Sequence, residues 1–564
     1  MNRAERRRDG KLHRTSGPPQ AGPDIQQLLK EGLLHHQGGR LSQAEHIYHQ
    51  ILLRDPQHAE ALHLRGLVAF RLGRLDEAAD LISTAIGHEA KSGTYAFNLG
   101  VVRQRQGRLT DAVTAYRNAI GSSPRYAEAH SNLGNVLLEQ GRLDEAVKAY
   151  RDALALKPEY VEAHNNLGVA LKEQGHISDA VRSYEEALRL NPNHVEAQSN
   201  MGIALMEQGH VGEAVGWFER ALRIKPDYVK AMYNLAFAFI RQQRFDEALT
   251  WLRKSAELKH NHGRPVPDQP VSCARLKHDA EQMRHLLDRS RIDPSYAGLA
   301  ESLRLFLHRA ESLAERPARV ALTRDELAAI SPVFNRIIYY GEGPALAGGA
   351  LNPALDVAAV EARYHAGLPE VMHIDQLLTD QALQSLRRFC LQSTIWKRDY
   401  ENGYLGAFFG DGFSCPLLLQ IAEELRLRFP GIFKHHRLTQ AWAFKYDSAL
   451  KGLNIHADAA AVNVNFWLTP DEANGDPSRG GLIVWDKKAP VEWNFNEYNS
   501  TKNEPKVREF LASSGARAIA IPYRANRAVV FNSDLFHETD QFHFKDEYES
   551  RRLNVTLLYG RRHG

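Results

Sequence analysis

Cysteine is scarce in this sequence, and the few that occur are scattered. Among 564 residues there are three, Cys273, Cys390 and Cys415, and none of them forms a CxxC pair. That spacing excludes a disulfide-stapled scaffold and a structural zinc module, and it suits a reducing compartment. We therefore expect a cytoplasmic protein.

Long apolar runs are also missing. No stretch of about 18 apolar residues occurs, so the sequence predicts no membrane-spanning helix and no membrane partner. Residues 1–23 are basic and polar, and they lack the apolar centre of a secretory signal. We expect these residues to form a flexible basic tail.

Neither sign of charge dominates. Lys and Arg together number 71 against 68 Asp and Glu, which leaves a net charge of +3. This balance gives no reason to expect a nucleic-acid partner. The 40 Gly and 24 Pro are too few for a collagen-like or low-complexity chain. The length allows about three or four domain-sized units.

What the sequence does contain is a repeat with a period of 34 residues. One column of the repeat is glycine, at Gly32, Gly66, Gly100, Gly134, Gly168 and Gly202. A second column holds alanine at all seven positions from Ala44 to Ala248. Small residues at fixed places let two antiparallel helices approach closely, and a boundary proline such as Pro158 starts the connection to the next unit. The pattern resembles the tetratricopeptide repeat family, which implies seven helix–turn–helix units stacked into a superhelix over residues 24–260.

A column of asparagines lies two positions before the glycine column. Its members are Asn98, Asn132, Asn166, Asn200 and Asn234. The resemblance implies that they lie on the first helix of each unit, which lines the inner face of the superhelix. A carboxamide both donates and accepts, so a row of them can hold the backbone of an extended peptide, and this row resembles the asparagine ladder of the O-GlcNAc transferase repeats. The alternative is that these amides cap helices or bridge neighbouring units.

The repeat ends after Lys259. Residues 261–270 contain three prolines, which predict a break in the helical pattern. Residues 271–289 and 294–315 then show the apolar spacing of helices. We interpret residues 261–365 as a Pro-containing linker followed by a helical connector.

The last part of the chain, residues 366–564, has a different pattern. Helices are expected at 376–392 and 415–428. They are followed by short β-rich runs at 441–447, 462–468, 481–486, 516–523, 526–532 and 552–560. Several short strands separated by turn signals indicate a sandwich or barrel, and the lack of alternating strands and helices argues against a parallel Rossmann sheet.

These strands carry a candidate metal site. His456 and Asp458 are two residues apart, so both side chains point to the same side of an extended segment. His537 follows in the run from 526, which we interpret as one strand leading into a third ligand. Two imidazoles and one carboxylate can occupy one face of an octahedral iron. A second HxD, at His373, precedes a helix rather than a β-rich run, and we interpret it as structural.

The order of residues around this site resembles the iron(II)- and 2-oxoglutarate-dependent oxygenases, in particular the prolyl-hydroxylase-like branch. The residues that carry the resemblance are Tyr446, His456, Asp458, His537 and Arg552. It implies a double-stranded β-helix (jelly-roll) domain with flanking helices over 366–564. It also implies Fe(II), 2-oxoglutarate and O₂ as cofactor and cosubstrates, with Tyr446 lining the pocket. Arginine suits the far carboxylate of 2-oxoglutarate because its planar fork matches a carboxylate.

Which arginine takes this role is open, because Arg551 and Arg552 are adjacent. We favour Arg552, because the residues from Arg552 to Thr556 match the order found in the family: an arginine, any residue, a small or polar residue and then an aliphatic stretch. In this register Asn554 lies on the same face as Arg552. By alternation, Asn465 and Trp467 share one face of their strand, and we expect both to border the 2-oxoglutarate. The alternative is that Trp467 is core and that the asparagine satisfies the strand edge.

Together the two parts indicate a dioxygenase that hydroxylates a residue of a peptide or protein captured by the repeats. One alternative is the same oxygenase acting on a small molecule, with the repeats as a docking arm. Another is a non-catalytic interaction scaffold whose barrel is a relic. The intact ligand set and Arg552 argue against the relic. A glycosyltransferase has no support, because the C-terminal part lacks a nucleotide-sugar-binding α/β pattern.

Overall fold

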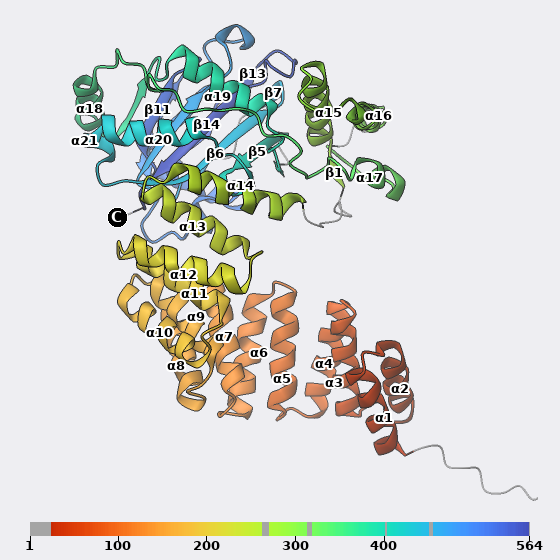
Figure 1. The fold of residues 1–564 in the computed structure, drawn as a ribbon. Coiled ribbons are helices and arrows are strands. Elements are labelled where there is room, and N and C mark those ends of the chain that lie inside the picture. The colour runs from red at the N-terminus through yellow and green to blue at the C-terminus, as the bar shows by residue number, and fades with distance from the viewer. Residues whose placement is uncertain (1–23, 262–269, 313–317, 401–402, 451–454, 563–564) are drawn as a thin grey trace, which may run out of the picture. The chain divides into compact units, whose positions relative to one another are not determined.

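A computed structural model describes residues 24–261, 270–312, 318–400, 403–450 and 455–562 (Figure 1). The chain divides into two compact units, Met1–Asn200 and Met201–Gly564. None of the helices in the described ranges is both long enough and apolar enough to cross a membrane.

The first unit is a row of antiparallel helix pairs. Its helices are α1 (Ile25–Gln37), α2 (Leu41–Arg54), α3 (Ala59–Arg71), α4 (Leu75–His88), α5 (Gly93–Arg105), α6 (Leu109–Ser122), α7 (Ala127–Glu139), α8 (Leu143–Leu156), α9 (Val161–Glu173) and α10 (Ile177–Leu190). Helix α11 (Val195–Glu207) crosses the boundary to the second unit. The pairs have the 34-residue period that the sequence predicts.

The glycine column has a direct packing reason. A Cβ atom added at Gly134 would lie 2.7 Å from the Cε1 atom of Tyr150, and one at Gly168 would lie 2.5 Å from that of Tyr184. A large side chain of the second helix therefore packs against the glycine of the first; it is a tyrosine in most units, Ile82 opposite Gly66 and Phe218 opposite Gly202. Glycines such as Gly141, with φ of +74°, provide the left-handed turn between the two helices.

The second unit continues the repeats and then adds helices and sheets. Its remaining repeat helices are α12 (Val211–Ile224), α13 (Val229–Arg241) and α14 (Phe245–Asn261). The connector contains β1 (Val271–Ser272), α15 (Cys273–Asp288), η1 (Pro294–Tyr296), α16 (Ala297–Glu311), β2 (Arg319–Val320) and α17 (Arg324–Ile330). These helices enclose a small apolar core of their own around Leu276 and Leu303.

A large antiparallel sheet dominates the rest of the chain. Its seven strands lie in the order β3 (Val371–Ile374), β11 (Ala528–Asn532), β8 (Val462–Trp467), β14 (Leu553–Tyr559), β6 (Leu438–Tyr446), β5 (Tyr404–Phe408) and β4 (Arg398–Asp399). A second sheet has the order β10 (Ala518–Ile521), β9 (Leu482–Lys488) and β12 (Leu535–Thr539), and β13 (Phe542–His543) pairs with β7 (Ala449–Leu450). The accompanying helices are α18 (Val357–Ala366), α19 (Asp380–Gln392), η2 (Phe409–Asp411), α20 (Pro416–Arg428), α21 (Pro430–Phe433), η3 (Asp471–Ala473), α22 (Phe495–Tyr498), η4 (Thr501–Asn503) and α23 (Glu504–Ser513).

The large sheet has two differently used faces. One face packs on α19 and α20, and the resulting core also takes in Ala236 of α13 and Leu252 of α14 (Figure 1). The other face meets the second sheet, and residues of both sheets, such as Tyr446 and Val484, form one apolar cluster. The last repeat and the large sheet thus share one core, and the candidate site lies on the opposite face.

Three local expectations differ from the structure. The run from 526 is two strands, because β11 ends at Asn532 and His537 lies in β12 of the other sheet. His373 precedes helix α19 as expected, but it lies in strand β3, paired with Val529, whereas we expected it outside the strands. Strands β3 and β5 lie outside the β-rich runs picked out from the sequence.

Candidate metal centre

Three side chains converge where the two sheets meet. His456, Asp458 and His537 each offer a ligand atom, and these atoms all lie within 4.8 Å of one another. The Nε2 atom of His537 lies 3.4 Å from Oδ2 of Asp458, and Nε2 of His456 lies 4.0 Å from Oδ1. The structure therefore brings together all three residues that the sequence singles out.

Backbone pairing holds the three ligands in register. His456 and His537 form an antiparallel bridge, with His456 N donating to His537 O at 3.0 Å and His537 N donating to His456 O at 2.8 Å. The backbone N–H of Asp458 donates to Ser533 O at 3.0 Å. Two short sequence segments that are about 80 residues apart are in this way fixed side by side.

The charge of Asp458 is maintained in a buried place. Burial opposes its ionisation, but the hydrogen bond from His537, the charges of His537 and His456 and the hydrogen bond from Asn463 together outweigh this and hold the pKa of Asp458 below its ordinary value. Nδ2 of Asn463 donates to Oδ2 of Asp458 at 2.6 Å. The Nδ1 atom of His537 is 3.1 Å from Leu535 O, which fixes its ring and leaves Nε2 toward the cluster.

This donor set fits iron(II). Two imidazoles and one carboxylate on one side of a site are the facial ligand arrangement of non-haem iron oxygenases, with open positions on the other side. The contact of His537 with Leu535 and the hydrogen bond from Asn463 to Asp458 are of the kind that orients metal ligands. His373 lies outside this group, as an exposed residue on β3.

Arg552 is buried near the same face with no acid beside it. The residue is 1% exposed, and Nε donates to Gly480 O at 2.8 Å while Nη2 donates to Gly481 O at 3.2 Å. No carboxylate of the described residues lies within ion-pair distance of its guanidinium. A buried cation whose hydrogen-bond partners are all uncharged fits a site for an anionic ligand group.

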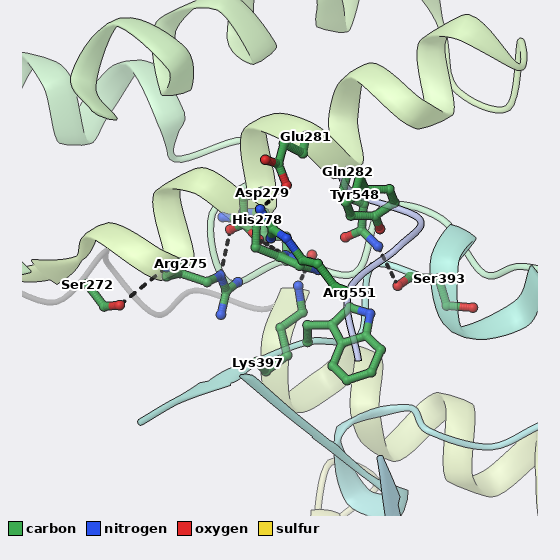
Figure 2. A network of polar contacts seen from close by, with 12 residues as sticks. Ser272, Arg275, His278, Asp279, Glu281, Gln282, Ser393, Lys397, Tyr548 and Arg551 are labelled. Atoms are coloured by element: carbon green, nitrogen blue, oxygen red, sulfur yellow. Dashed lines mark hydrogen bonds and ion pairs between the residues drawn. The ribbon is translucent and has the colours of Figure 1, made fainter. Parts of the chain in front are cut away.

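Arg551 points elsewhere. Its guanidinium lies 2.5 Å from a carboxylate oxygen of Glu281, within the polar network around helix α15 (Figure 2). The structure thus separates the two neighbouring arginines, one toward the candidate site and one toward α15.

The other predicted pocket residues lie around Arg552. Its guanidinium carbon is 4.7 Å from the ring centre of Tyr446 and 5.8 Å from that of Trp467. Nη1 donates to Oδ1 of Asn554 at 3.4 Å. Burial, which outweighs hydrogen bonds from Thr539 and Arg552, raises the pKa of Tyr446, so this phenol stays neutral.

Asn465 continues the same polar face. Its Nδ2 donates to Thr556 Oγ1 at 3.1 Å, and Thr556 is the cross-strand partner of Asn465 between β14 and β8. Three buried atoms on this face, Asn463 Oδ1, Asn465 Oδ1 and Trp467 Nε1, lack a hydrogen-bond partner among the described residues. Unsatisfied buried polar atoms of this kind indicate a place for a polar ligand.

A cavity of about 340 Å³ opens beside the metal ligands. His456 and Asp458 line it, together with a wall of aromatic side chains from β5 and β6. Its remaining lining comes from Arg398, Tyr400, Gln440, Ile455, Ala459, Phe495, Asn499, Ser500 and Leu558. The cavity leaves room for a substrate next to the cluster.

Two features of the site escaped the sequence reasoning. Asn463 contacts Asp458 directly, although it shares the alternating face of Asn465 and Trp467 and could have been found by that pattern. Gly480 and Gly481 have no side chain that could mark a chemical role, yet their carbonyls hold Arg552. Only the fold brings this turn to the end of β14.

The asparagine column is engaged in contacts between neighbouring units. Asn98 lies 2.8 Å from His63 of the preceding repeat, and Asn166 donates to Asn135 at 2.9 Å. Asn200 donates to Asn165 at 2.9 Å. These contacts match the bridging alternative. Asn132 bonds Tyr116, and Asn234 is half-buried on α13. Peptide binding by this column stays a prediction.

Family comparisons concern the helical part. Models described as TPR repeat match residues 100–141 and 134–175. Models described as tetratricopeptide repeat match residues 29–93, 165–229 and 205–264. The N-terminal helices are tetratricopeptide repeats. Repeats of this type present extended concave surfaces that bind peptides or proteins.

Comparison with curated proteins gives no match. Among solved structures, YrrB, described as a TPR protein with an unusual peptide-binding site, is 23% identical, with a TM-score of 0.28 over 33% of this chain and 95% of its own. PilF of Pseudomonas aeruginosa is 22% identical, with a TM-score of 0.33 over 36% of this chain and 93% of its own. A tetratricopeptide repeat protein of Parabacteroides merdae is 16% identical, with a TM-score of 0.37 over 42% and 94%.

Proposed function

We propose that this chain is an iron(II)- and 2-oxoglutarate-dependent dioxygenase that hydroxylates a residue of a peptide or protein held by its repeats. The observation that carries the proposal is a two-histidine, one-carboxylate cluster together with a buried arginine, directly before β14, that has no carboxylate of the described residues within ion-pair distance. The two antiparallel sheets around this site support a double-stranded β-helix.

Each residue has a defined task in this proposal. His456, Asp458 and His537 would hold the ion from one side, and Asn463 would keep the carboxylate oriented. Bound iron supplies the activation of O₂ that is coupled to decarboxylation of 2-oxoglutarate and to hydroxylation of a C–H bond. The protein contributes position, because the substrate must lie beside the ion while water is excluded.

Arg552 would bind the far carboxylate of 2-oxoglutarate through its planar fork. Two of its nitrogens are already fixed by the carbonyls of Gly480 and Gly481, so its orientation is set before the ligand arrives. Tyr446 and Trp467 flank the guanidinium with aromatic rings and keep water away from it. Exclusion of water strengthens the interaction between the two charges.

The proposal is tested without a substrate. Under anaerobic conditions, the full chain loaded with iron(II) and 2-oxoglutarate should develop the visible charge-transfer band of a chelated keto acid. His456→Ala should abolish the band. His373→Ala is the matched control, because His373 belongs to the other HxD and should leave the band intact. Absence of the band at saturating 2-oxoglutarate in the unmodified protein would show that the proposal is wrong and would favour a binding scaffold.

A further inference from the structure

The cavity beside the metal ligands has a strongly aromatic wall. Its aromatic lining consists of Tyr400, Tyr404, Phe408, Trp442, Phe444 and Phe495. Tyr400 and Tyr404 are stacked with ring centres 4.3 Å apart, and Phe408 and Trp442 lie 5.8 Å apart. A wall of this kind favours a side chain with a flat or apolar surface.

One arginine supplies the positive charge in the cavity lining. Apart from Asp458, the described lining residues include no carboxylate, and Arg398 is the one Lys or Arg among them. The Arg398 side chain is 52% exposed, and its guanidinium carbon lies 4.3 Å from the ring centre of Phe408. It therefore presents a cation to anything that enters along the aromatic wall.

The partner of Arg398 inside the protein is shared with other bases. Nε of Arg398 donates to Oδ2 of Asp411 at 3.0 Å, while Lys259 and His260 contact Oδ1 of the same carboxylate at 2.5 and 3.0 Å. Burial, which outweighs the hydrogen bond to Asp411, lowers the pKa of His260 and so favours its neutral form. One carboxylate thus faces two permanent cations, which leaves a positive excess of about one charge at this place.

The last repeat contacts the same carboxylate, that of Asp411. Lys259 and His260 belong to α14, and Asp411 belongs to η2, which directly follows the cavity strand β5. Phe237 of α13 packs edge-on against Phe409 of η2 with ring centres 5.7 Å apart. The last repeat therefore holds, from behind the cavity wall, the carboxylate that pairs with Arg398. The exposed guanidinium beside an aromatic wall favours an occupant that carries both an apolar group and a carboxylate.

We propose that the cavity takes an uncharged, apolar or aromatic side chain of a peptide, and that Arg398 binds the carboxylate of an acidic residue close to it in the same peptide. The inference rests on the proposed function, since it names the substrate class of that site. A basic peptide is disfavoured, because Arg398 would repel it.

The test measures binding and needs no turnover. The probes are fluorescein-labelled Gly–Ser peptides with a central Leu, Phe, Lys or Glu, each flanked either by Glu or by Lys. Anisotropy is measured without oxygen on the full chain loaded with Mn(II) and 2-oxoglutarate. Peptides with a central Leu or Phe and Glu flanks should bind about tenfold tighter than their Lys-flanked counterparts. Arg398→Glu should reverse the flank preference, and the exposed Lys434→Glu, outside the cavity lining, should leave it unchanged.

The outcomes separate this inference from the proposed function. The charge-transfer band, recorded on the same preparations with iron(II), reports on the dioxygenase alone. If the band forms but flank charge has no effect, or if Arg398→Glu keeps the original preference, the inference is overturned. If the band forms and none of the peptides binds, the peptide occupant is wrong and a small molecule takes its place. If the flank preference and its reversal appear without the band, the peptide site stands and the dioxygenase falls.

Discussion

Asn463 donates a hydrogen bond of 2.6 Å to the Oδ2 atom of Asp458, and neither residue is more than 5% exposed. The amide therefore fixes the one carboxylate of the three-residue cluster from the strand behind it. It does so without being a ligand itself, and its position follows from the alternation of β8.

Replacing Asn463 with Leu should weaken metal binding by about 10- to 100-fold, which is the usual cost of losing an outer contact of a metal ligand. The measurement is a Mn(II) titration followed by electron paramagnetic resonance. Asn465→Ala is the matched control, since the amide of Asn465 bonds Thr556 instead. Equal affinity in all three proteins would show that Asn463 does not orient Asp458.

The two adjacent arginines should respond differently to the same change. Arg552→Gln should raise the 2-oxoglutarate concentration needed for the visible band by about 10- to 100-fold, because a charge-assisted hydrogen bond contributes about 1.5–3 kcal/mol. Arg551→Gln should leave that concentration unchanged. It should lower the free energy of unfolding by about 2 kcal/mol, because Glu281 loses its ion pair. If Arg551→Gln instead raised the required 2-oxoglutarate concentration and Arg552→Gln did not, Arg551 would be the residue that binds 2-oxoglutarate.

The first unit should lose stability in mild acid through His63. Burial, and to a smaller extent the nearby His36, lowers the pKa of His63 from 6.5 to about 4. Between these values the unfolded state binds the proton and the folded state does not, so the free energy of unfolding falls as the pH falls. The full effect, below pH 4, is about 3 kcal/mol.

Urea titrations of the full chain between pH 7 and pH 4, followed by amide exchange in α3, measure this effect. His63→Gln keeps a polar partner for Asn98 and should flatten the pH dependence. His49→Gln, at an exposed position of α2, is the control and should leave the pH dependence in place. A dependence that survives in the His63 variant would assign it to another group.

One substitution distinguishes the two possible roles of the asparagine column, bridging of neighbouring repeats and peptide binding. Asn166→Ala removes the donor to Asn135 and should lower the free energy of unfolding by about 1 kcal/mol if the column bridges repeats. Lys148→Ala, at an exposed position of α8, is the control. Unchanged stability together with weaker binding of a peptide would instead support a peptide clamp.

The repeats were predictable because their cause is local. Gly134 and Tyr150 meet within one unit of the period, so the spacing of small residues carries the packing directly. The short strands were partly predictable from alternation, which placed Asn465 and Trp467 on one face. Strand β12 was missed because residues 526–538 were interpreted as one strand, although Asn532, Ser533 and Asp534 interrupt the apolar residues. The chain changes sheet at Ser533 and Asp534, and that depends on long-range pairing with β9.

The metal ligands were predictable from residue type and order, whereas their supports were not. The pair His456 and Asp458 is visible as a motif. The carbonyls of Gly480 and Gly481 carry no side-chain signal, and their role appears only when β9 lies near Arg552. The division of labour between Arg551 and Arg552 likewise depends on helix α15, which is about 270 residues earlier in the chain.

The core shared by the last repeat and the large sheet has a consequence for folding. A solenoid ordinarily unravels unit by unit from either end, because each repeat contacts only its neighbours. Here Ala236 and Leu252 are buried in one cluster with Leu386 of α19 and Phe409 of η2, so the C-terminal end of the array is anchored. Fraying is confined to the end at α1, and the amide protons of α14 should exchange as slowly as those of the sheet. A polypeptide cut after residue 260 would leave that anchored surface bare to water and prone to aggregation.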